Sequence, residues 1–289
     1  MVTRMGHMTL RVPDVGAAVA FSEEVLGLRE VERIDGTSYL TCNDRHHELA
    51  IAPGKKAAYG SIGLEVENAD ALEATLAAAE TAGGKRLGAV EEPAVEGAAL
   101  VEGPGGHVFR LFHGMATGQP EEYETRGVRP LRPEHVSLNV RNRPKMEAFL
   151  ENGLGFEFSD RIGGAGSWWR CEAIHHGVAL VRTPKNGLAH YAFALRDFDD
   201  FRAIGDRLHE RGMKLCWGPG RHGPGNNLFI YFFDAAGILV ECCVDMAEVG
   251  PGRDYTPQRW KLRPGNISLW GGVPPPKFLA ADAPCAAPE

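Results

Sequence analysis

The sequence has no long apolar run and no excess of basic residues. No stretch of about 18 apolar residues occurs, the length that a membrane-spanning helix needs. Residues 1–16 lack the charged and then apolar pattern of an export signal. Acidic residues outnumber basic ones, 38 to 31, and the net charge of −7 offers no basic surface for a phosphate backbone. We therefore expect a cytoplasmic protein with neither a membrane nor a nucleic acid as its partner.

Closely spaced cysteine pairs are also missing. Six cysteines occur among 289 residues, and none of them forms a C-x-x-C motif. A chain of this length buries a large core without cross-links, so we expect reduced thiols that serve mainly in packing. Hydrophobic residues make up 44% and charged residues 24% of the chain, a balance typical of globular proteins.

The most informative feature present is an internal repeat. Residues 6–12 align with residues 134–140, which places His7 opposite His135. Residues 20–28 align in the same way with residues 148–156. The register persists to Arg110 in the first copy and Glu241 in the second. A repeat of this length indicates that one folded unit has been duplicated.

Both copies predict the same order of elements. Each begins with an alternating strand at its histidine, continues with a helix and three short strands, and ends with a second helix and two more strands. Such a mixture predicts an α+β fold. The first copy has predicted helices at 15–26 and 70–82 and strands at 38–42, 48–52 and 62–67; the second has helices at 145–153 and 199–211 and strands at 168–171, 177–181 and 191–196.

Composition divides the chain into four parts. The first copy spans residues 1–116, a linker rich in Pro, Gly and charge follows at 117–133, the second copy spans 134–249, and 250–289 form an extension. We expect residues 250–270 to pack across the second copy through their aromatic side chains, and residues 274–289 to be loose. The aromatic residues are Tyr255, Trp260 and Trp270.

The two copies differ in their polar residues. His135, His190 and Glu241 lie in the first, middle and last strands of the second copy. Two imidazoles and one carboxylate are the ligand set that Fe(II) and Mn(II) take in oxygenases, with positions left open for substrate and dioxygen. One such residue alone is usually structural, but the three together predict a metal site. Their counterparts in the first copy are His7, Ser61 and Arg110. We assign His7 a structural role because these neighbours cannot complete a site.

These motifs resemble the type I extradiol ring-cleavage dioxygenases of the vicinal oxygen chelate superfamily, over most of the chain. The resemblance rests on His135 in Glu-His-Val-Ser-Leu, His190 in Gly-Leu-Ala-His-Tyr-Ala-Phe and Glu241 in Asp-Ala-Ala-Gly-Ile-Leu-Val-Glu. It implies two tandem domains, each of paired βαβββ modules that form an open, barrel-like sheet around a cavity. It also implies that residues 134–249 hold the metal and that residues 1–116 hold none.

The resemblance assigns roles to four further residues. His176 would donate a proton during catalysis, although His46 and His47 stand at the same place in the first copy and leave a role in the strand turn open. His222 and Tyr231 would hydrogen-bond the substrate hydroxyls. Trp168 is either a wall that stacks on the substrate ring or an ordinary core residue. The glycine-rich loop before His222 does not open a helix, which argues against a phosphate site.

The implied activity is extradiol (meta) cleavage of a catechol-type aromatic diol by O2, with Fe(II) as the cofactor, or Mn(II) as the alternative, and a hydroxymuconate-type product. No arginine can be assigned as a clamp for a substrate carboxylate, which favours an uncharged aromatic ring. The resemblance also implies a homo-oligomer. Two alternatives remain open: another metalloenzyme of the superfamily, such as a glyoxalase-type isomerase, and a metal-free protein that binds an aromatic ligand.

Overall fold

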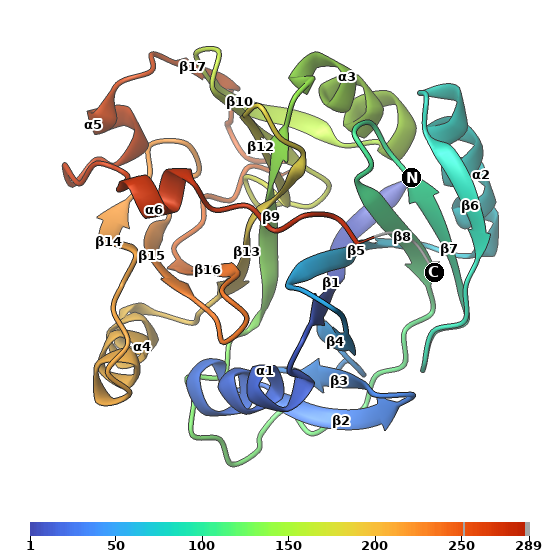
Figure 1. The fold of residues 1–289 in the computed structure, drawn as a ribbon. Coiled ribbons are helices and arrows are strands. Elements are labelled where there is room, and N and C mark those ends of the chain that lie inside the picture. The colour runs from blue at the N-terminus through green and yellow to red at the C-terminus, as the bar shows by residue number, and fades with distance from the viewer. Residues whose placement is uncertain (251, 287–289) are drawn as a thin grey trace.

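The computed structural model describes residues 1–250 and 252–286, and it contains two large sheets (Figure 1). The first sheet has eight strands in the order β2-β3-β4-β1-β5-β8-β7-β6, and the second has nine in the order β14-β15-β16-β13-β9-β12-β11-β10-β17. The predicted α+β class with two tandem units is confirmed. No helix among the described residues is long and apolar enough to cross a bilayer.

The first unit contains the predicted helices and strands in the predicted order, but it has two strands more than the pattern shows: β2 before the three short strands, and three strands instead of two after the second helix. Its elements are β1 (Val2–Val12), α1 (Val15–Phe21), the π-helical turn η1 (Ser22–Leu26), β2 (Arg29–Ile34), β3 (Thr37–Thr41), β4 (Leu49–Pro53), β5 (Ala58–Val66), α2 (Ala69–Thr81), β6 (Lys85–Ala89), β7 (Gly97–Glu102) and β8 (Val108–His113).

The second unit repeats this order and adds an extension. Its elements are β9 (Arg132–Val140), α3 (Arg143–Ala148), the π-helical turn η2 (Phe149–Leu154), β10 (Glu157–Ile162), β11 (Gly166–Arg170), β12 (Val178–Arg182), β13 (Gly187–Ala194), α4 (Phe198–Glu210), β14 (Trp217–Arg221), β15 (Leu228–Phe233) and β16 (Leu239–Val244), followed by β17 (Gln258–Trp260), α5 (Pro264–Ile267) and α6 (Pro276–Leu279).

Each sheet consists of two βαβββ modules. The first strands of the two modules lie antiparallel at the centre of the sheet, β1 beside β5 and β9 beside β13. Within each module the first and last strands are parallel, as in β9 with β12 and β13 with β16. This pairing brings the first strand, the middle strand and the last strand of a unit next to one another, so residues far apart in the sequence face one cavity.

Local sequence explains where the first helix of each unit begins and ends. The side chain of Asp14 accepts a hydrogen bond from the backbone N–H of Ala17, and Asn142 caps α3 in the same way. Gly27 and Gly155 end the helical segments with φ of 81° and 80°, a conformation that glycine adopts without strain. The helices predicted at 15–26 and 145–153 are confirmed, with the second beginning two residues earlier.

The apolar core is continuous between the two units. Buried side chains of both sheets belong to a single contact cluster. At the boundary the rings of Phe109 and Phe149 lie 5.7 Å apart, and the backbone N–H of Met5 donates to Glu172 of the second unit at 2.8 Å. All six cysteines are free, as predicted.

The first part of the extension packs on the second unit. Asp160 accepts hydrogen bonds from the Tyr255 hydroxyl at 2.6 Å and from the Trp260 indole N–H at 2.7 Å. The prediction for residues 250–270 is thus confirmed at these two residues; residue 251 lies outside the described part. It is wrong for Trp270, which is 54% exposed. In this region it is Ile267, the last residue of α5, that lines the cavity.

The prediction that residues 274–289 are loose is wrong for the described part, 274–286. The backbone of Ala283 exchanges two hydrogen bonds of 2.8 Å with Leu188 on β13. Two residues further on, Tyr59 on β5 bonds to the backbone of Pro284 and Ala286. The segment therefore crosses from the second unit to the first, since both strands offer it unpaired main-chain groups. Residues 287–289 lie outside the described residues.

Candidate metal centre and substrate cavity

Three polar side chains of the second unit meet on neighbouring strands. His135 lies on β9, His190 on β13 and Glu241 on β16, which are adjacent in the sheet. The two Nε2 atoms are 3.2 Å apart, and they lie 3.0 Å (His135) and 3.2 Å (His190) from Oε2 of Glu241. All three side chains are buried. The structure therefore brings together the three residues that the sequence predicts as metal ligands.

The electrostatics of this group suit a cation. Burial by itself would raise the pKa of Glu241, but the charges and hydrogen bonds of His135 and His190 hold that pKa well below its usual range. Burial lowers the pKa of His190. At neutral pH the group therefore offers a carboxylate and an unprotonated imidazole at His190, the forms in which these side chains bind metals. A buried carboxylate beside two imidazoles is the donor set that the predicted ion requires.

Two neighbours fix the orientation of the carboxylate. The Tyr231 hydroxyl donates to Oε2 of Glu241 at 2.7 Å, and the Asn227 amide donates to Oε1 at 3.0 Å. His222 places its Nε2 3.0 Å from the same hydroxyl and its Nδ1 2.8 Å from the carbonyl of Ile267. Since a carbonyl only accepts, Nδ1 of His222 carries the proton. Tyr231 therefore has one proton for two acceptors, Glu241 and a neutral His222.

His176 lies on the other side of His135, in the turn before β12. The centroids of the two rings are 4.4 Å apart. Its Nδ1 lies 2.9 Å from Nδ1 of His175, which leaves Nε2 for the cavity. Burial, followed by the nearby charge on His135, lowers the pKa of His176 well below its ordinary value. The side chain is therefore neutral at pH 7.

A cavity of about 280 Å³ opens over this group. It lies near the lower end of the roughly 300–1,000 Å³ that small-molecule sites occupy. None of the described residues that line it is a lysine or arginine. Alternation along β9 directs His135, Ser137 and Asn139 into it. The walls are mostly apolar and include Trp168, Ala179, Val181, Trp217, Leu239 and Phe278.

A family model covers most of both units. The model of the Glyoxalase/Bleomycin resistance protein/Dioxygenase superfamily matches residues 4–111 and 132–242. The chain belongs to this superfamily.

Individual relatives of the superfamily align along nearly the whole chain. A manganese-dependent 2,3-dihydroxybiphenyl 1,2-dioxygenase of Geobacillus genomosp. 3 is 27% identical over 81% of this chain and 82% of its own length. An iron-dependent extradiol dioxygenase of Rhodococcus jostii (strain RHA1) is 24% identical over 93% and 96%. The solved structure of a Mn(II)-bound glyoxalase from Novosphingobium aromaticivorans is 26% identical, covers 100% of this chain and 96% of that chain, and superimposes with a TM-score of 0.89.

Within this superfamily site, the structure places every side chain predicted from the sequence at or beside the cavity. His176, His222, Tyr231 and Trp168 all line it. Trp168 is half-buried, with its ring centroid 6.4 Å from that of His176, so it is a wall of the cavity and not part of the closed core.

Two groups at the superfamily site were not found from the sequence. Phe278 on α6 lies with its ring centroid 4.8 Å from that of Tyr231, and Asn227 holds Glu241. Phe278 stands in a proline-rich segment without periodicity, so no pattern marks it. Asn227 precedes β15 directly opposite the glutamate strand, and this proximity depends on the pairing of β15 with β16.

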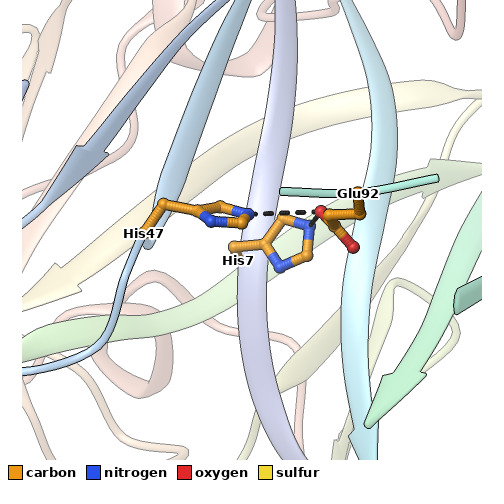
Figure 2. A group of neighbouring side chains, drawn as sticks. All are labelled: His7, His47 and Glu92. Atoms are coloured by element: carbon orange, nitrogen blue, oxygen red, sulfur yellow. Dashed lines mark hydrogen bonds and ion pairs between the residues drawn. The ribbon is translucent and has the colours of Figure 1, made fainter. Parts of the chain in front are cut away.

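The first unit differs from the prediction in one respect. The comparison of the copies considered only Ser61 and Arg110 as partners of His7. In the structure His7 meets His47 and Glu92, a residue of the β6–β7 loop whose importance the sequence does not reveal (Figure 2). The comparison of the copies therefore missed the two side chains that stand beside His7.

Proposed function

We propose that the protein is an extradiol dioxygenase that opens the ring of an uncharged catechol-type diol with O2 and requires Fe(II) or Mn(II). The observation that carries the proposal is the buried group of His135, His190 and Glu241 at the base of an apolar cavity. Relatives named as iron-dependent and manganese-dependent dioxygenases support both metals. When bound, the ion supplies Lewis acidity for the diol and a coordination position for O2.

The chain's own residues position the substrate and move its protons. The neutral His176 accepts a proton from a substrate hydroxyl through Nε2 and returns it later to a departing oxygen. His222 and Tyr231 form a hydrogen-bonded pair that fixes the position of the other hydroxyl. Trp168 and Phe278 bound the space in which the ring lies, and they keep water away from it.

The proposed preference for uncharged diols follows from the lining of the cavity. An anionic substrate carboxylate would enter an apolar space without a cationic partner among the described lining residues, which is costly. We expect catechol and 3-methylcatechol to be turned over at least about 100-fold more efficiently, in kcat/KM, than 3,4-dihydroxybenzoate, since an unpaired buried charge costs several kcal/mol. Equal efficiencies would show that a cation reaches the cavity.

The decisive experiment is oxygen uptake by anaerobically purified, Fe(II)-loaded protein mixed with catechol or 2,3-dihydroxybiphenyl in air. We expect one O2 per diol and a yellow product, and neither with the His190→Ala variant. Loading with Mn(II) in parallel identifies the metal that supports turnover. If metal binds but no diol consumes O2, the metal centre stands and the reaction assignment fails.

A glyoxalase-type isomerase is the second candidate, because the Mn(II)-bound glyoxalase aligns over the full chain. Such an enzyme would convert a hemithioacetal without O2. The same metal-loaded protein is therefore assayed with the hemithioacetal of methylglyoxal and glutathione under argon. Turnover there, with none on diols in air, would replace the dioxygenase by the isomerase.

We also propose that the protein is cytoplasmic and that its domain boundaries are those of the repeat, 1–116 and 134–249, with an extension at 250–289.

We further propose that the protein is a homo-oligomer. Several large apolar side chains of the extension are exposed and support an association between copies. Light scattering of the wild type and of Trp270→Asp tests it; a monomeric wild type would contradict it. The exposed residues are Leu262 (56%), Leu269 (46%), Trp270 (54%), Val273 (61%) and Leu279 (69%).

A further inference from the structure

The first unit contains a second group of two imidazoles and one carboxylate. His7 Nε2 lies 2.7 Å and His47 Nε2 lies 3.2 Å from the same atom, Oε1 of Glu92 (Figure 2). The corresponding distances to Glu241 in the second unit are 3.0 and 3.2 Å. Two ligand atoms about 2.1 Å from one ion, at an angle of about 90–110°, lie about 3.0–3.4 Å apart. Both groups thus have nearly the spacing of a ligand set.

This group is not a copy of the one in the second unit. His7 on β1 corresponds to His135, but His47 corresponds to His176, which is a cavity residue in the second unit. The carboxylate comes from the loop between β6 and β7, where the second unit has the loop of His222. Glu92 does not correspond to Glu241 of the second unit. The duplication alone therefore does not explain why a carboxylate stands beside the two histidines of the first unit.

Some polar atoms of this group lack hydrogen-bond partners. Both ring nitrogens of His7 and the Oε2 atom of Glu92 are buried without a hydrogen bond. His7 Nε2 does lie 2.7 Å from Oε1 of Glu92 as an ion pair, so Nδ1 of His7 and Oε2 of Glu92 are the atoms of this pair left without a partner. Buried polar atoms left in this state cost about 1–3 kcal/mol each. A cation placed between them would satisfy the lone pairs on both sides.

The neighbours of His47 orient it as a ligand. His46 lies with Nε2 3.3 Å from the carboxylate of Glu32 and Nδ1 3.0 Å from Nδ1 of His47. If His46 directs its proton at Glu32, its Nδ1 accepts from His47, and Nε2 of His47 carries only a lone pair toward Glu92. A ligand histidine whose other nitrogen donates to a polar neighbour is the usual arrangement around protein-bound metals.

Arg110 and Gly63 complete the surroundings of the group. The Arg110 guanidinium donates to Oε1 of Glu92 at 2.9 Å, whereas Oε2 has no hydrogen bond. Gly63 on β5 lets the His7 ring approach the backbone, because a Cβ at this position would lie 2.6 Å from the ring. The second unit has Ala192 at the equivalent position. Close packing of this kind holds the donors in place before any ion binds.

We propose that His7, His47 and Glu92 bind a divalent first-row transition metal ion in a structural site of the first unit. None of the three residues lines the substrate cavity, so the ion fixes the β3–β4 and β6–β7 loops to the central strand β1. The inference replaces the prediction that residues 1–116 hold no metal. It does not depend on the reaction catalysed by the second unit.

Anomalous diffraction from crystals of the wild-type protein grown with Mn(II), and separately with Zn(II), tests the site directly. We expect one peak among His135, His190 and Glu241 and a second among His7, His47 and Glu92. A peak at the second unit alone would overturn the proposal. A peak at the first unit alone would support the proposal and contradict the metal requirement of the proposed function.

Metal content measured by mass spectrometry after dialysis gives an independent reading. We expect two ions per chain in the wild type and one in Glu92→Gln, in His47→Ala and in His190→Ala. Glu91→Gln, an exposed neighbour in the same loop, is the matched control and keeps two. Unchanged content in Glu92→Gln would overturn the proposal. If that variant unfolds, thermal unfolding of His190→Ala with added Mn(II) decides: a rise in Tm supports the first-unit site, and no rise contradicts it.

Discussion

At the scale of single residues, the hydroxyl of Tyr231 has the most direct influence on the ligand group. The Tyr231 hydroxyl donates a hydrogen bond to Oε2 of Glu241, the oxygen that His135 and His190 also contact. The same hydroxyl lies beside Nε2 of His222. Burial, followed by the negative charge of Glu241, raises the pKa of Tyr231 well above its usual range, so the hydroxyl keeps its proton. It can therefore donate to a substrate oxygen or a ligand throughout the physiological pH range.

We predict that Tyr231→Phe keeps its metal but loses about 10- to 100-fold in kcat/KM on catechol, since a hydrogen bond to a charged group is worth about 1.5–3 kcal/mol. Metal analysis and steady-state oxygen uptake measure the two effects separately. The control is Tyr191→Phe, whose hydroxyl donates to Asp234 away from the cavity. Loss of metal in Tyr231→Phe would instead show that the tyrosine hydroxyl is needed to hold Glu241 in position for the metal.

A second prediction concerns a histidine of the first unit. Burial lowers the pKa of His107 from 6.5 to about 4. Between these values the unfolded chain binds a proton at His107 and the folded chain does not, so the stability present above pH 6.5 is lost as the pH falls. The expected loss of unfolding free energy from this residue is about 2 kcal/mol between pH 7.5 and 5.

Urea unfolding at the two pH values measures this loss. In His107→Asn the difference in unfolding free energy between pH 7.5 and pH 5 becomes smaller by about 2 kcal/mol, because the asparagine does not titrate. His209→Asn, an exposed histidine on α4, leaves the pH dependence unchanged. Equal slopes in wild type and His107→Asn would show that His107 titrates alike in both states.

At the scale of elements, the extension contributes the wall that closes the cavity. Helix α6 places the Phe278 ring with its centroid 4.7 Å from that of Trp217 and 4.8 Å from that of Tyr231. The backbone bonds of Ala283 to Leu188 anchor the helix to β13. The position of the wall therefore depends on pairing of the extension with a central strand.

Phe278→Ala is predicted to raise KM for catechol about 2- to 10-fold, since an aromatic contact is worth about 0.5–1.5 kcal/mol beyond its buried area. We expect kcat to change little, because Phe278 has no group that transfers a proton. Val273→Ala, an exposed position of the same extension, is the control in steady-state assays. A fall in kcat at constant KM would indicate that Phe278 acts on the chemical step.

At the scale of the whole molecule, the continuous core couples the two units. Packing of Phe109 on Phe149 and the bonds of the extension to β5 and β13 join them on two sides. Each unit therefore loses buried contacts when the other unfolds. We expect cooperative unfolding of the entire chain.

Calorimetry of the metal-loaded protein should show a single transition, and removal of metal with EDTA should shift it downward. An ion present at 100 times its Kd raises the unfolding free energy by about 2.7 kcal/mol, which corresponds to roughly 4–5 °C for a chain of 289 residues. Two resolved transitions would show that the units unfold independently. An unchanged Tm would show that no ion is bound.

The sequence alone determined the duplication and the α+β class, placed the helices to within one or two residues, and identified the three side chains of the second unit that lie together in the structure. These follow from local signals: apolar alternation, capping residues, glycine ends and polar residues that stand out against the other copy. The positions of His135, His190 and Glu241 could be predicted because the repeat assigns each one to a strand, and the strands are adjacent in every module pair.

Only the tertiary structure decided where irregular segments lie. Glu92 belongs to a loop and Phe278 to a proline-rich extension, so neither has a periodic neighbourhood that predicts its direction. Their places depend on long-range contacts: Arg110 on β8 holds Glu92, and backbone bonds to β5 and β13 hold the extension. Alternation along a strand fixes which way a side chain points, whereas a loop takes its course from the surfaces that it meets after the sheets have formed.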